Sequence, residues 1–527
     1  MVKNLIKRPI LPTDVLIACV FIILVVFHPY YLHQKINLFE LGLYLPGINA
    51  VLDGQVPFRD FFYLRGPMDL YLAAGLMKIF GTNVAVLASY FYIGTVITLC
   101  VCALIASEVI PSRLLFFTLV PILVIRTFPR VVFTYWGGMR YAWGLLAVWC
   151  VIRFLQFRHR GWILAAALLT VIAGLTSIEI GVCLVAAISV TLVFAHRRGL
   201  MAYWIILFAC LLPYNYYLAM HGAWADYVNT QIVVVREMVH TFPQTEPVPS
   251  SILEVLRALF VPTNKNFHQM TPLYCYFIFG GYLFWRWRNK TLDLIDQAVL
   301  LVAVYGFMVY VTGFRNLWAN VFEMSLQPQK IVLFYLLARL VEYCSVKQKK
   351  TAYVLLTVII LSSAVFCIVR INKRFLFFRK DPLKGQQVKA LDIPRLKGFI
   401  VPKEQADDIE GLKKFVDGHV GRQEVMLMYP EMGAMHFIVD RPWVGRFASA
   451  TLTWFSQDWF EGWMQGLHAH PPRYAACLKQ MPDYFYTCYF KVESNRRYFQ
   501  ETMDYIDQHY NRVGQTPNYW ILERKVN

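Results

Sequence analysis

Long apolar stretches, separated by short polar connections, fill the first 370 residues of the chain. A helix crosses the hydrocarbon core of a bilayer with about 20 apolar residues, and with fewer where polar cavities intrude. No small-residue cleavage site follows the first stretch, so we expect a retained helix there rather than a signal peptide. The pattern predicts about eleven membrane-spanning helices, near residues 15–31, 84–106, 113–125, 140–157, 162–176, 180–195, 201–219, 271–285, 297–313, 329–343 and 352–370.

Basic residues gather at every second connection between the later predicted spans, which is typical of cytoplasmic loops. The clusters lie at residues 158–160, 196–198, 286–290 and 347–350. These clusters fall on the same side of the membrane as the basic N-terminus only if residues 67–80, which follow Gly66, do not cross it. We therefore expect a helix at the outer interface there, starting at Pro67. The N-terminus is then cytoplasmic and the C-terminus extracytoplasmic.

This orientation divides the chain into two predicted domains. Residues 1–370 form a transmembrane domain, whose first outer loop is 32–83 and whose second large outer loop is 220–270. Residues 371–527 are mostly polar and numerous enough to form an extracytoplasmic domain of their own.

The C-terminal region combines patterns of both kinds of secondary structure. Short apolar stretches predict strands at 425–428 and 484–486, whereas 404–417 and 494–509 have helical patterns. The predicted fold class is therefore an all-α polytopic membrane domain with interfacial helices, followed by a small mixed α/β domain.

Composition agrees with a membrane protein. Hydrophobic residues make up 57% of the 527 residues and charged residues 16%, against about 25% charged in soluble domains. The formal net charge of +18 comes from 51 Lys+Arg and 33 Asp+Glu. Such an excess also suits nucleic-acid binding, but these basic residues lie between apolar stretches. We therefore expect membrane lipids, and no nucleic acid, as partners.

The first outer loop carries the most informative acidic residues. Glu40 lies in a short apolar, helix-like run and has no close basic neighbour in the sequence. Asp60 lies among aromatic residues beside Arg59, and Asp53 precedes a glycine in a turn pattern. Carboxylates among aromatic residues at a membrane surface are costly unless paired, so they are candidate functional groups. The alternative for Asp60 is a structural ion pair with Arg59 or Arg65.

Several short patterns together resemble the GT-C superfamily of membrane glycosyltransferases, which includes lipid A aminoarabinose transferases and protein O-mannosyltransferases. The resemblance extends loosely over residues 12–345. It rests on the order of five segments: Glu40 before Gly42-Leu43-Tyr44, the block Gly54 to Phe61, the stretch Gly66-Pro67 to Gly81, the turn Ser177 to Gly181, and Gly313-Phe314-Arg315-Asn316. In the last segment Phe314 separates a Gly-Arg pair that is adjacent in the family.

The resemblance implies a hexosyl- or pentosyltransferase in the cell (inner) membrane. Such an enzyme moves a sugar, with inversion, from a polyprenyl-phosphate donor to a hydroxyl of a lipid, glycan or protein at the extracytoplasmic face. One carboxylate suffices as the general base, most efficiently if desolvation raises its pKa. We hypothesise that Glu40 is this base, with Asp60 as its helper or as an acceptor-binding group.

The departing phosphate needs cations, and arginine can hold phosphate oxygens in two places. Arg315 is the first candidate from its motif, followed by Arg126 and Arg140. Each could instead be an interfacial arginine whose stem covers apolar surface. The predicted substrate-binding residues are Glu179, Tyr44 and Arg59.

The sequence indicates no cofactor and no metal site, although a divalent metal is left open. His468-Ala469-His470 lacks nearby carboxylate ligands and is interpreted as a solvated turn. Trp454, Trp459 and Trp463 have near-helical spacing and could form either a sugar platform or an interface anchor.

Three other functions remain as alternatives. A transporter or flippase of lipid-linked glycans would show charges within its spans and broken helices in paired halves, and few such features are present. A glycan polymerase or ligase would favour a long loop between two late spans. A non-catalytic scaffold would not bring Glu40, Asp60 and Arg315 together in one outer cavity.

Overall fold

A computed structural model describes residues 9–27, 29–127, 138–242, 251–264, 266–313, 324–370 and 381–525. The chain divides into two compact units. The helical unit comprises Met1–Pro29, Tyr90–Leu212 and Pro247–Lys380. The mixed unit comprises Tyr30–Ser89, Pro213–Glu246 and Asp381–Asn527. The predicted domain boundary at residue 370 stays a prediction, but the C-terminal region shares its unit with the whole of the first predicted outer loop.

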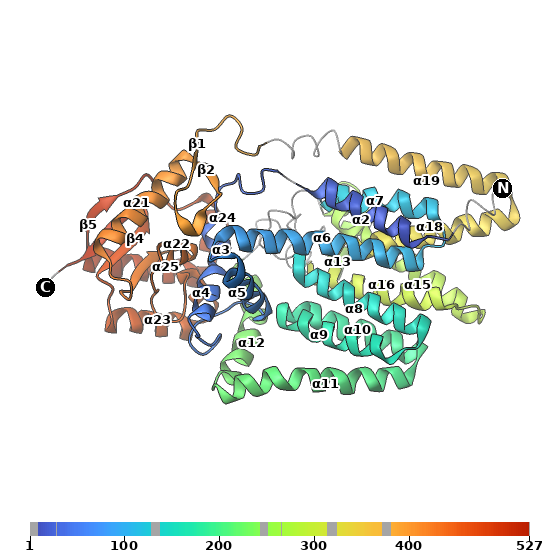
Figure 1. The fold of residues 1–527 in the computed structure, drawn as a ribbon, viewed down its shortest axis with the longest axis horizontal. Helices are drawn as coiled ribbons and strands as arrows, with labels where there is room; N and C mark the ends of the chain where they lie inside the picture. The colour runs from blue at the N-terminus through green and yellow to red at the C-terminus, as the bar shows by residue number, and fades with distance from the viewer. Residues whose placement is uncertain are drawn as a thin grey trace. The chain divides into compact units, whose positions relative to one another are not determined.

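Each predicted apolar stretch coincides with one helix (Figure 1). These helices are α2 (Pro12–Val26), α6 (Val84–Val109), α7 (Arg113–Thr127), α8 (Gly138–Phe157), α9 (Arg160–Thr176), α10 (Ile178–Ala195), α11 (Arg197–Met220), α15 (Pro272–Arg288), α16 (Leu294–Thr312), α18 (Gln327–Lys347) and α19 (Lys349–Arg370). Two short helices, α13 (Ile252–Phe260) and α14 (Phe267–Met270), precede α15.

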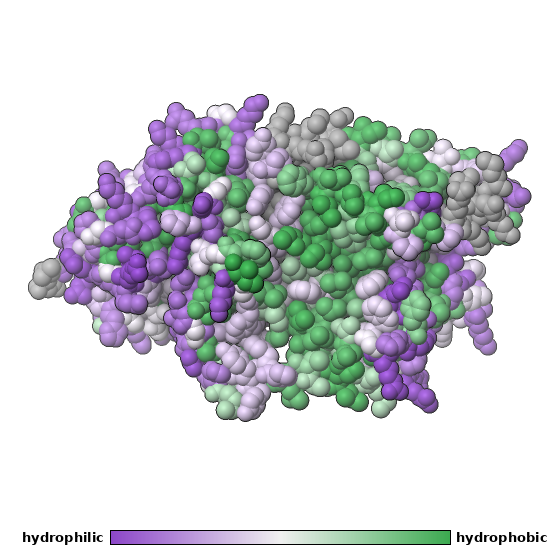
Figure 2. All heavy atoms as spheres, in the orientation of Figure 1, coloured by the Kyte–Doolittle hydropathy of each residue, from purple (hydrophilic) through white to green (hydrophobic). Residues whose placement is uncertain are grey.

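The apolar helices make this a multi-pass membrane protein. Among the described residues, five helices are long and apolar enough to cross a membrane: α6, α10, α11, α16 and α19. Shorter apolar helices include α2 and α9. Hydrophobic side chains cover much of the visible face of the helical unit (Figure 2).

Neighbouring helices of this unit pack closely. Helix α10 contacts α8, α9 and α16, and α18 contacts α16 and α19. At the crossing of α9 and α10, a Cβ built on Gly181 would lie 2.6 Å from the Cα atom of Gly174. Glycine at these two positions therefore lets the two backbones touch, as is common between membrane helices.

Charged residues inside the helical unit form ion pairs. Asp14 of α2 is fully buried and lies 2.6 Å from a guanidinium nitrogen of Arg113. Asp296 of α16 is also fully buried and pairs with Arg286 at 2.9 Å. Because each carboxylate has a cationic partner, these acidic residues have a structural explanation.

The mixed unit contains two small sheets. Strands β1 (Val388–Ala390) and β2 (Ile400–Pro402) pair antiparallel. The larger sheet has the order β3-β4-β6-β5, in which β3 and β4 are parallel and the other pairs antiparallel. Its strands are β3 (Met426–Tyr429), β4 (Tyr474–Leu478), β5 (Tyr510–Gln515) and β6 (Tyr519–Arg524).

Helices from three stretches of the chain complete this unit. They are α3 (Leu38–Gly42), α4 (Leu45–Leu52), α5 (Met68–Phe80), α12 (Trp224–Thr241), α21 (Lys403–His419), α22 (Gly433–Val439), α23 (Gln457–Ala469), α24 (Asp483–Thr487) and α25 (Glu493–His509). The short 3-10 helices η4 (Ala450–Phe455) and η5 (Tyr489–Lys491) connect some of them. Helix α5 has 13 residues, which is about 20 Å and shorter than a bilayer core.

The strand predicted at 425–428 and the helices predicted at 404–417 and 494–509 are confirmed as β3, α21 and α25. The strand predicted at 484–486 is wrong, because these residues belong to helix α24. Phe485 is buried between exposed neighbours. Over only three residues, this alternation occurs in helices as well as in strands. Pro482 directly before α24 instead marks a helix start.

Candidate active site

Glu40 lies on α3, and the sequence before it determines where that helix begins. The side chain of Asn37 accepts hydrogen bonds from the backbone N–H groups of Phe39 at 3.1 Å and Glu40 at 3.0 Å. This is an N-cap, which satisfies N–H groups at the start of a helix. Glu40 therefore projects from the first turn of α3, and its side chain is partly buried.

A contact between two glycines brings a second glutamate to this helix. A Cβ on Gly42 would lie 2.8 Å from both the Cα of Gly433 and the backbone nitrogen of Ala434. Helices α3 and α22 therefore meet backbone to backbone. Glu40 precedes Gly42 by two residues, and Glu431 precedes Gly433 by two residues. Each glutamate therefore lies two residues from the point where the two backbones meet.

Glu40 interacts electrostatically with an arginine of the first loop. Its charge raises the pKa of Arg65. Arg65 donates a hydrogen bond to the hydroxyl of Tyr44 and lies 5.4 Å from the centre of that ring. Burial lowers the pKa of Arg65, but the phenols of Tyr44 and Tyr63 and the charges of Glu40 and Asp69 raise it by more, so the net change is upward. The guanidinium is therefore held as a fixed positive charge.

Glu431 has a different environment, because it is only 6% exposed. Burial raises the pKa of Glu431 to about 8, hydrogen bonding with Tyr484 and Tyr489 lowers it in part, and the charge of Glu40 raises it. The hydroxyl of Tyr484 donates to Oε2 of Glu431. We refer to Glu40, Arg65, Glu431, Tyr484 and Tyr489 as the carboxyl cluster; all five belong to the mixed unit.

Asp60 is engaged elsewhere in the loop. Its carboxylate binds Arg59 through two hydrogen bonds of 2.7 and 2.8 Å and accepts a third, of 2.7 Å, from the backbone of Val56. The hydrogen bonds from Arg59 lower the pKa of Asp60 more than burial raises it. This ionised pair holds the tight turn in which Phe58 has a φ of 71°. The structural alternative considered for Asp60 is therefore the observed one, and an additional role in substrate binding stays a prediction.

The other predicted residues occupy several places. Tyr44 is fully buried beside the carboxyl cluster. Glu179 lies in the first turn of α10, in the helical unit. Arg140 of α8 is 7% exposed and donates to the hydroxyl of Tyr141 at 3.1 Å. Arg126 lies on α7, and its side chain is outside the described part of the structure, as is the whole of Arg315.

Sequence reasoning missed Glu431, Tyr484 and Tyr489 and gave Arg65 only a pairing role. One signal could have identified Glu431, because it is the only acidic residue in the largely apolar segment 425–439. The two tryptophans at 454 and 463 are 3% and 4% exposed and pack in the core of the mixed unit. Their faces are therefore not available as a sugar platform.

A small polar pocket of about 250 Å³ lies in the mixed unit. It is lined by Arg236, Glu237, His240, Thr241, Trp454, Phe455, Ser456, Gln457, Val492, Ser494 and Tyr498. The ring of Phe242, at the end of α12, lies 5.1 Å from that of Phe455 and 5.0 Å from that of Tyr489. One layer of aromatic rings thus connects this pocket with the carboxyl cluster.

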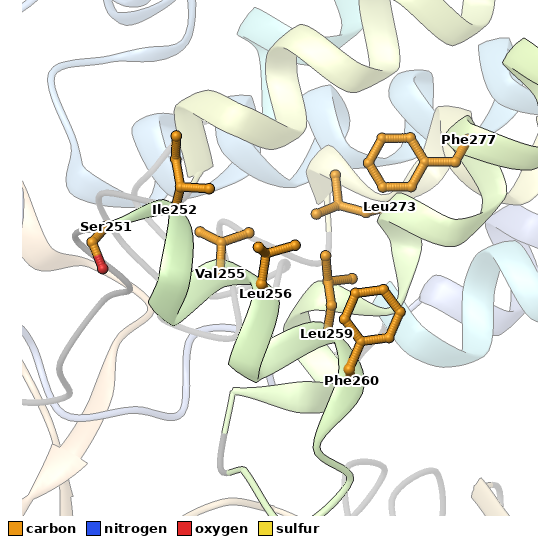
Figure 3. A pocket seen from close by; sticks show the side chains of 8 residues that line it. All are labelled: Ser251, Ile252, Val255, Leu256, Leu259, Phe260, Leu273 and Phe277. Atoms are coloured by element: carbon orange, nitrogen blue, oxygen red, sulfur yellow. The ribbon is translucent and has the colours of Figure 1, made fainter.

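An apolar pocket of about 400 Å³ lies in the helical unit, between α13 and α15. Figure 3 shows side chains of the two helices around one hollow. They are Ser251, Ile252, Val255, Leu256, Leu259, Phe260, Leu273 and Phe277. Ile252 and Phe260 are 82% and 68% exposed, so the pocket opens onto an apolar surface.

No group of three or more metal-ligating side chains occurs within the described residues. The histidines at 468 and 470 lie at the end of α23, where His468 packs against the ring of Tyr505 at 4.7 Å.

No family model matches the sequence, and neither does any curated protein. Among solved structures, two crystal structures of ArnT from Cupriavidus metallidurans match 97% of this chain and 97% of theirs, each with a TM-score of 0.53. The chain has the ArnT fold. Sequence identity is 10% to the ArnT structure bound to undecaprenyl phosphate and 11% to the apo structure. The predicted GT-C-like fold, with its helical membrane part and mixed α/β part, is confirmed.

Proposed function

We propose that this protein is a membrane glycosyltransferase that moves a sugar from a polyprenyl-phosphate donor to an acceptor hydroxyl, with inversion, at the extracytoplasmic face. The observation that carries the proposal is the carboxyl cluster, in which Glu40 faces a fixed cation and a second carboxyl group. The ArnT fold supports it, because one ArnT structure is bound to undecaprenyl phosphate.

Glu40 is the proposed general base. Attack on the anomeric carbon requires that the acceptor hydroxyl lose its proton, and one partly buried carboxylate can take it. The two catalytic carboxylates of a glycosidase are not needed, because no water molecule is activated. Arg65 places a positive charge beside this carboxyl group.

The leaving polyprenyl phosphate is an anion and needs donors that stabilise its developing charge. Arg65 is the described cation that interacts with Glu40, and we propose it as a phosphate contact. Arg140 is a further candidate, since its Nε atom is buried and has no hydrogen-bond partner among the described residues. Arg315 and Arg126 keep this role as sequence predictions, as do Glu179, Tyr44 and Arg59 for substrate binding.

The lipid chain of the donor requires an apolar surface. We propose that part of it occupies the pocket between α13 and α15, where seven of the eight lining residues are apolar. Burial of hydrocarbon there would add about 25 cal/mol for each Å² removed from water.

The test is transfer from radiolabelled polyprenyl-phosphate hexoses and pentoses, using purified protein in lipid nanodiscs with a membrane-extract acceptor. Replacing Glu40→Gln removes the base but keeps the size of the side chain, and should lower the rate by about 10²- to 10⁴-fold. Asp53→Asn is the matched control, since Asp53 is an exposed turn residue of the same loop, and it should retain the wild-type rate.

Full transfer by Glu40→Gln would exclude Glu40 as the base. If wild-type protein instead moved the labelled donor between leaflets without transferring sugar, the flippase alternative would replace this proposal. Repeating the assay with EDTA decides whether a divalent metal takes part.

A further inference from the structure

The backbone next to Glu431 is tightly packed, so this residue has little freedom to move. It follows β3 and directly precedes α22. A Cβ on Gly433 would lie 2.3 Å from the Oγ atom of Ser449 and 3.1 Å from the Cα of Gly42. Helix α22 is therefore held between α3 and Ser449, the residue before η4. Glu431 cannot move away from Glu40 without opening that contact.

The groups that face Glu431 come from three other elements. Glu40 on α3 contributes a negative charge, and Tyr484 on α24 and Tyr489 on η5 contribute hydroxyl groups. Arg65 is the cation of the cluster, and it interacts with Glu40. Arg65 also interacts with Asp69 of α5, which is 3% exposed. The cation of this set is thus already engaged with two carboxyl groups, and a further buried carboxylate at Glu431 would lack its own counter-charge.

We propose that Glu431 is a positioning residue that stays protonated at neutral pH, so that the carboxyl cluster carries one negative charge, on Glu40, opposite one positive charge, on Arg65. This role rests on the proposed function, in which Glu40 is the base. Glu431 acts through Glu40 and does not need to touch the substrate.

The protonation state of Glu431 has a consequence for the reaction. Ionisation of Glu431 would place a second negative charge in a site of low dielectric, where like charges repel strongly. That charge would compete with Glu40 for Arg65 and would repel the phosphate of the donor. The raised pKa of Glu431, about 8, means that the neutral form predominates below this pH and is lost above it.

The experiment is an infrared titration of the purified full-length protein in nanodiscs between pH 5 and pH 10, which follows the carbonyl band of protonated carboxyl groups. The wild type should retain one such band at pH 7 and lose it with a midpoint near 8. The band should be absent from Glu431→Gln. It should be unchanged in Glu461→Gln, which removes an exposed glutamate of the same unit. Absence of the band from wild-type protein at pH 7 would overturn the proposal.

Two further variants test the neighbours and do not depend on the folding of Glu431→Gln. Glu40→Gln removes the nearby negative charge and should shift the midpoint downward by on the order of one pH unit. Tyr484→Phe removes a hydrogen bond that favours the ionised form, and should shift the midpoint upward. A midpoint that responds to neither variant would show that Glu431 is not part of the cluster.

The pH profile of transfer separates positioning from a merely structural role. The wild-type rate should fall as the pH passes the infrared midpoint, whereas Glu431→Gln, which cannot ionise, should keep its rate to a higher pH. Equal profiles would contradict the role of Glu431 even if transfer itself is confirmed. If no donor supports transfer, the proposed function fails, and the infrared titration still decides whether Glu431 holds a proton.

Discussion

Identical side chains in the carboxyl cluster have different chemical properties because their neighbours differ. Glu40 faces the guanidinium of Arg65 and is only partly buried. Glu431 is almost fully buried and faces Glu40 together with two phenols. A nearby cation favours the ionised form of a carboxyl group, while burial and a nearby anion favour the protonated form. Glu40 can therefore act as the base while Glu431 stays neutral beside it.

Arg65 provides the first prediction at this scale. Arg65→Gln removes the fixed positive charge, and should lower kcat/KM for the donor by about 10²-fold because neither Glu40 nor the leaving phosphate keeps its cation. Arg65→Lys keeps the charge but loses the planar group that binds Tyr44, and should recover part of the rate. Donor-dependent transfer kinetics provide the measurement.

The control for this pair is Arg497→Gln, which removes an exposed arginine of α25. It should leave kcat/KM unchanged. Equal activity of Arg65→Gln and wild type would remove Arg65 from the phosphate site and leave Arg140, Arg126 and Arg315 as the candidates.

At the scale of elements, one contact between short helices determines the geometry of the site. Helices α3 and α22 approach so closely that neither Gly42 nor Gly433 has room for a side chain. Both helices are short, with five and seven residues, so their own hydrogen bonds contribute little stability. Packing against each other, and of α22 against α4 and α21, must therefore hold the two glutamates in place.

Gly42→Ala tests this dependence. The added methyl group would lie 2.8 Å from backbone atoms of α22, and such overpacking should cost about 1–3 kcal/mol in the free energy of unfolding. Transfer should fall more steeply than stability, since the two carboxyl groups separate as the helices move apart. Thermal unfolding and transfer rates of the same preparations give both quantities.

Gly462→Ala is the comparison for this variant. Gly462 lies within α23 and has no atoms near the position of an added Cβ. Alanine is the better helix former there by roughly 0.5–1 kcal/mol, so this variant should be slightly more stable and fully active. A stable and active Gly42→Ala would show that the close contact is not required.

The sequence allowed the elements to be predicted much better than the site. Apolar stretches located the membrane helices, because a bilayer imposes length and composition on each helix separately. The aromatic run at 484–486 was too short to distinguish a strand from a helix. Glu40 could be identified from its neighbours in the sequence. Glu431 comes close to Glu40 only through a contact between segments that are far apart in the sequence, and a periodic pattern of apolar residues does not predict such a contact.

At the scale of the whole molecule, the exposed apolar surface of the helical unit accounts for the unusual composition. Along α19 the five most exposed large apolar residues recur every three or four positions: Val354, Val358, Leu361, Val365 and Ile368. In a soluble protein such residues would form a large unpaired patch, but in a membrane they contact lipid chains. The fold thus combines a lipid-facing helical unit with a mixed unit that contributes the candidate base.

The same lipid environment is the source of the proposed donor, and the pocket between α13 and α15 allows a direct test of how its chain is held. Leu256→Glu places a charge inside the pocket. It should weaken binding of undecaprenyl phosphate by about tenfold or more, because the bound lipid chain would no longer cover a leucine there. Leu253→Glu is the matched control, since Leu253 lies on the same helix, is 64% exposed and is not part of the pocket lining. Native mass spectrometry of the nanodisc-released protein measures both affinities. Inorganic phosphate, which has no chain, should bind both variants as it binds wild type. An equal loss of undecaprenyl phosphate binding in the two leucine variants would mean that added charge on α13 disturbs binding in general, and the lipid chain would then have to be placed elsewhere on the helical unit.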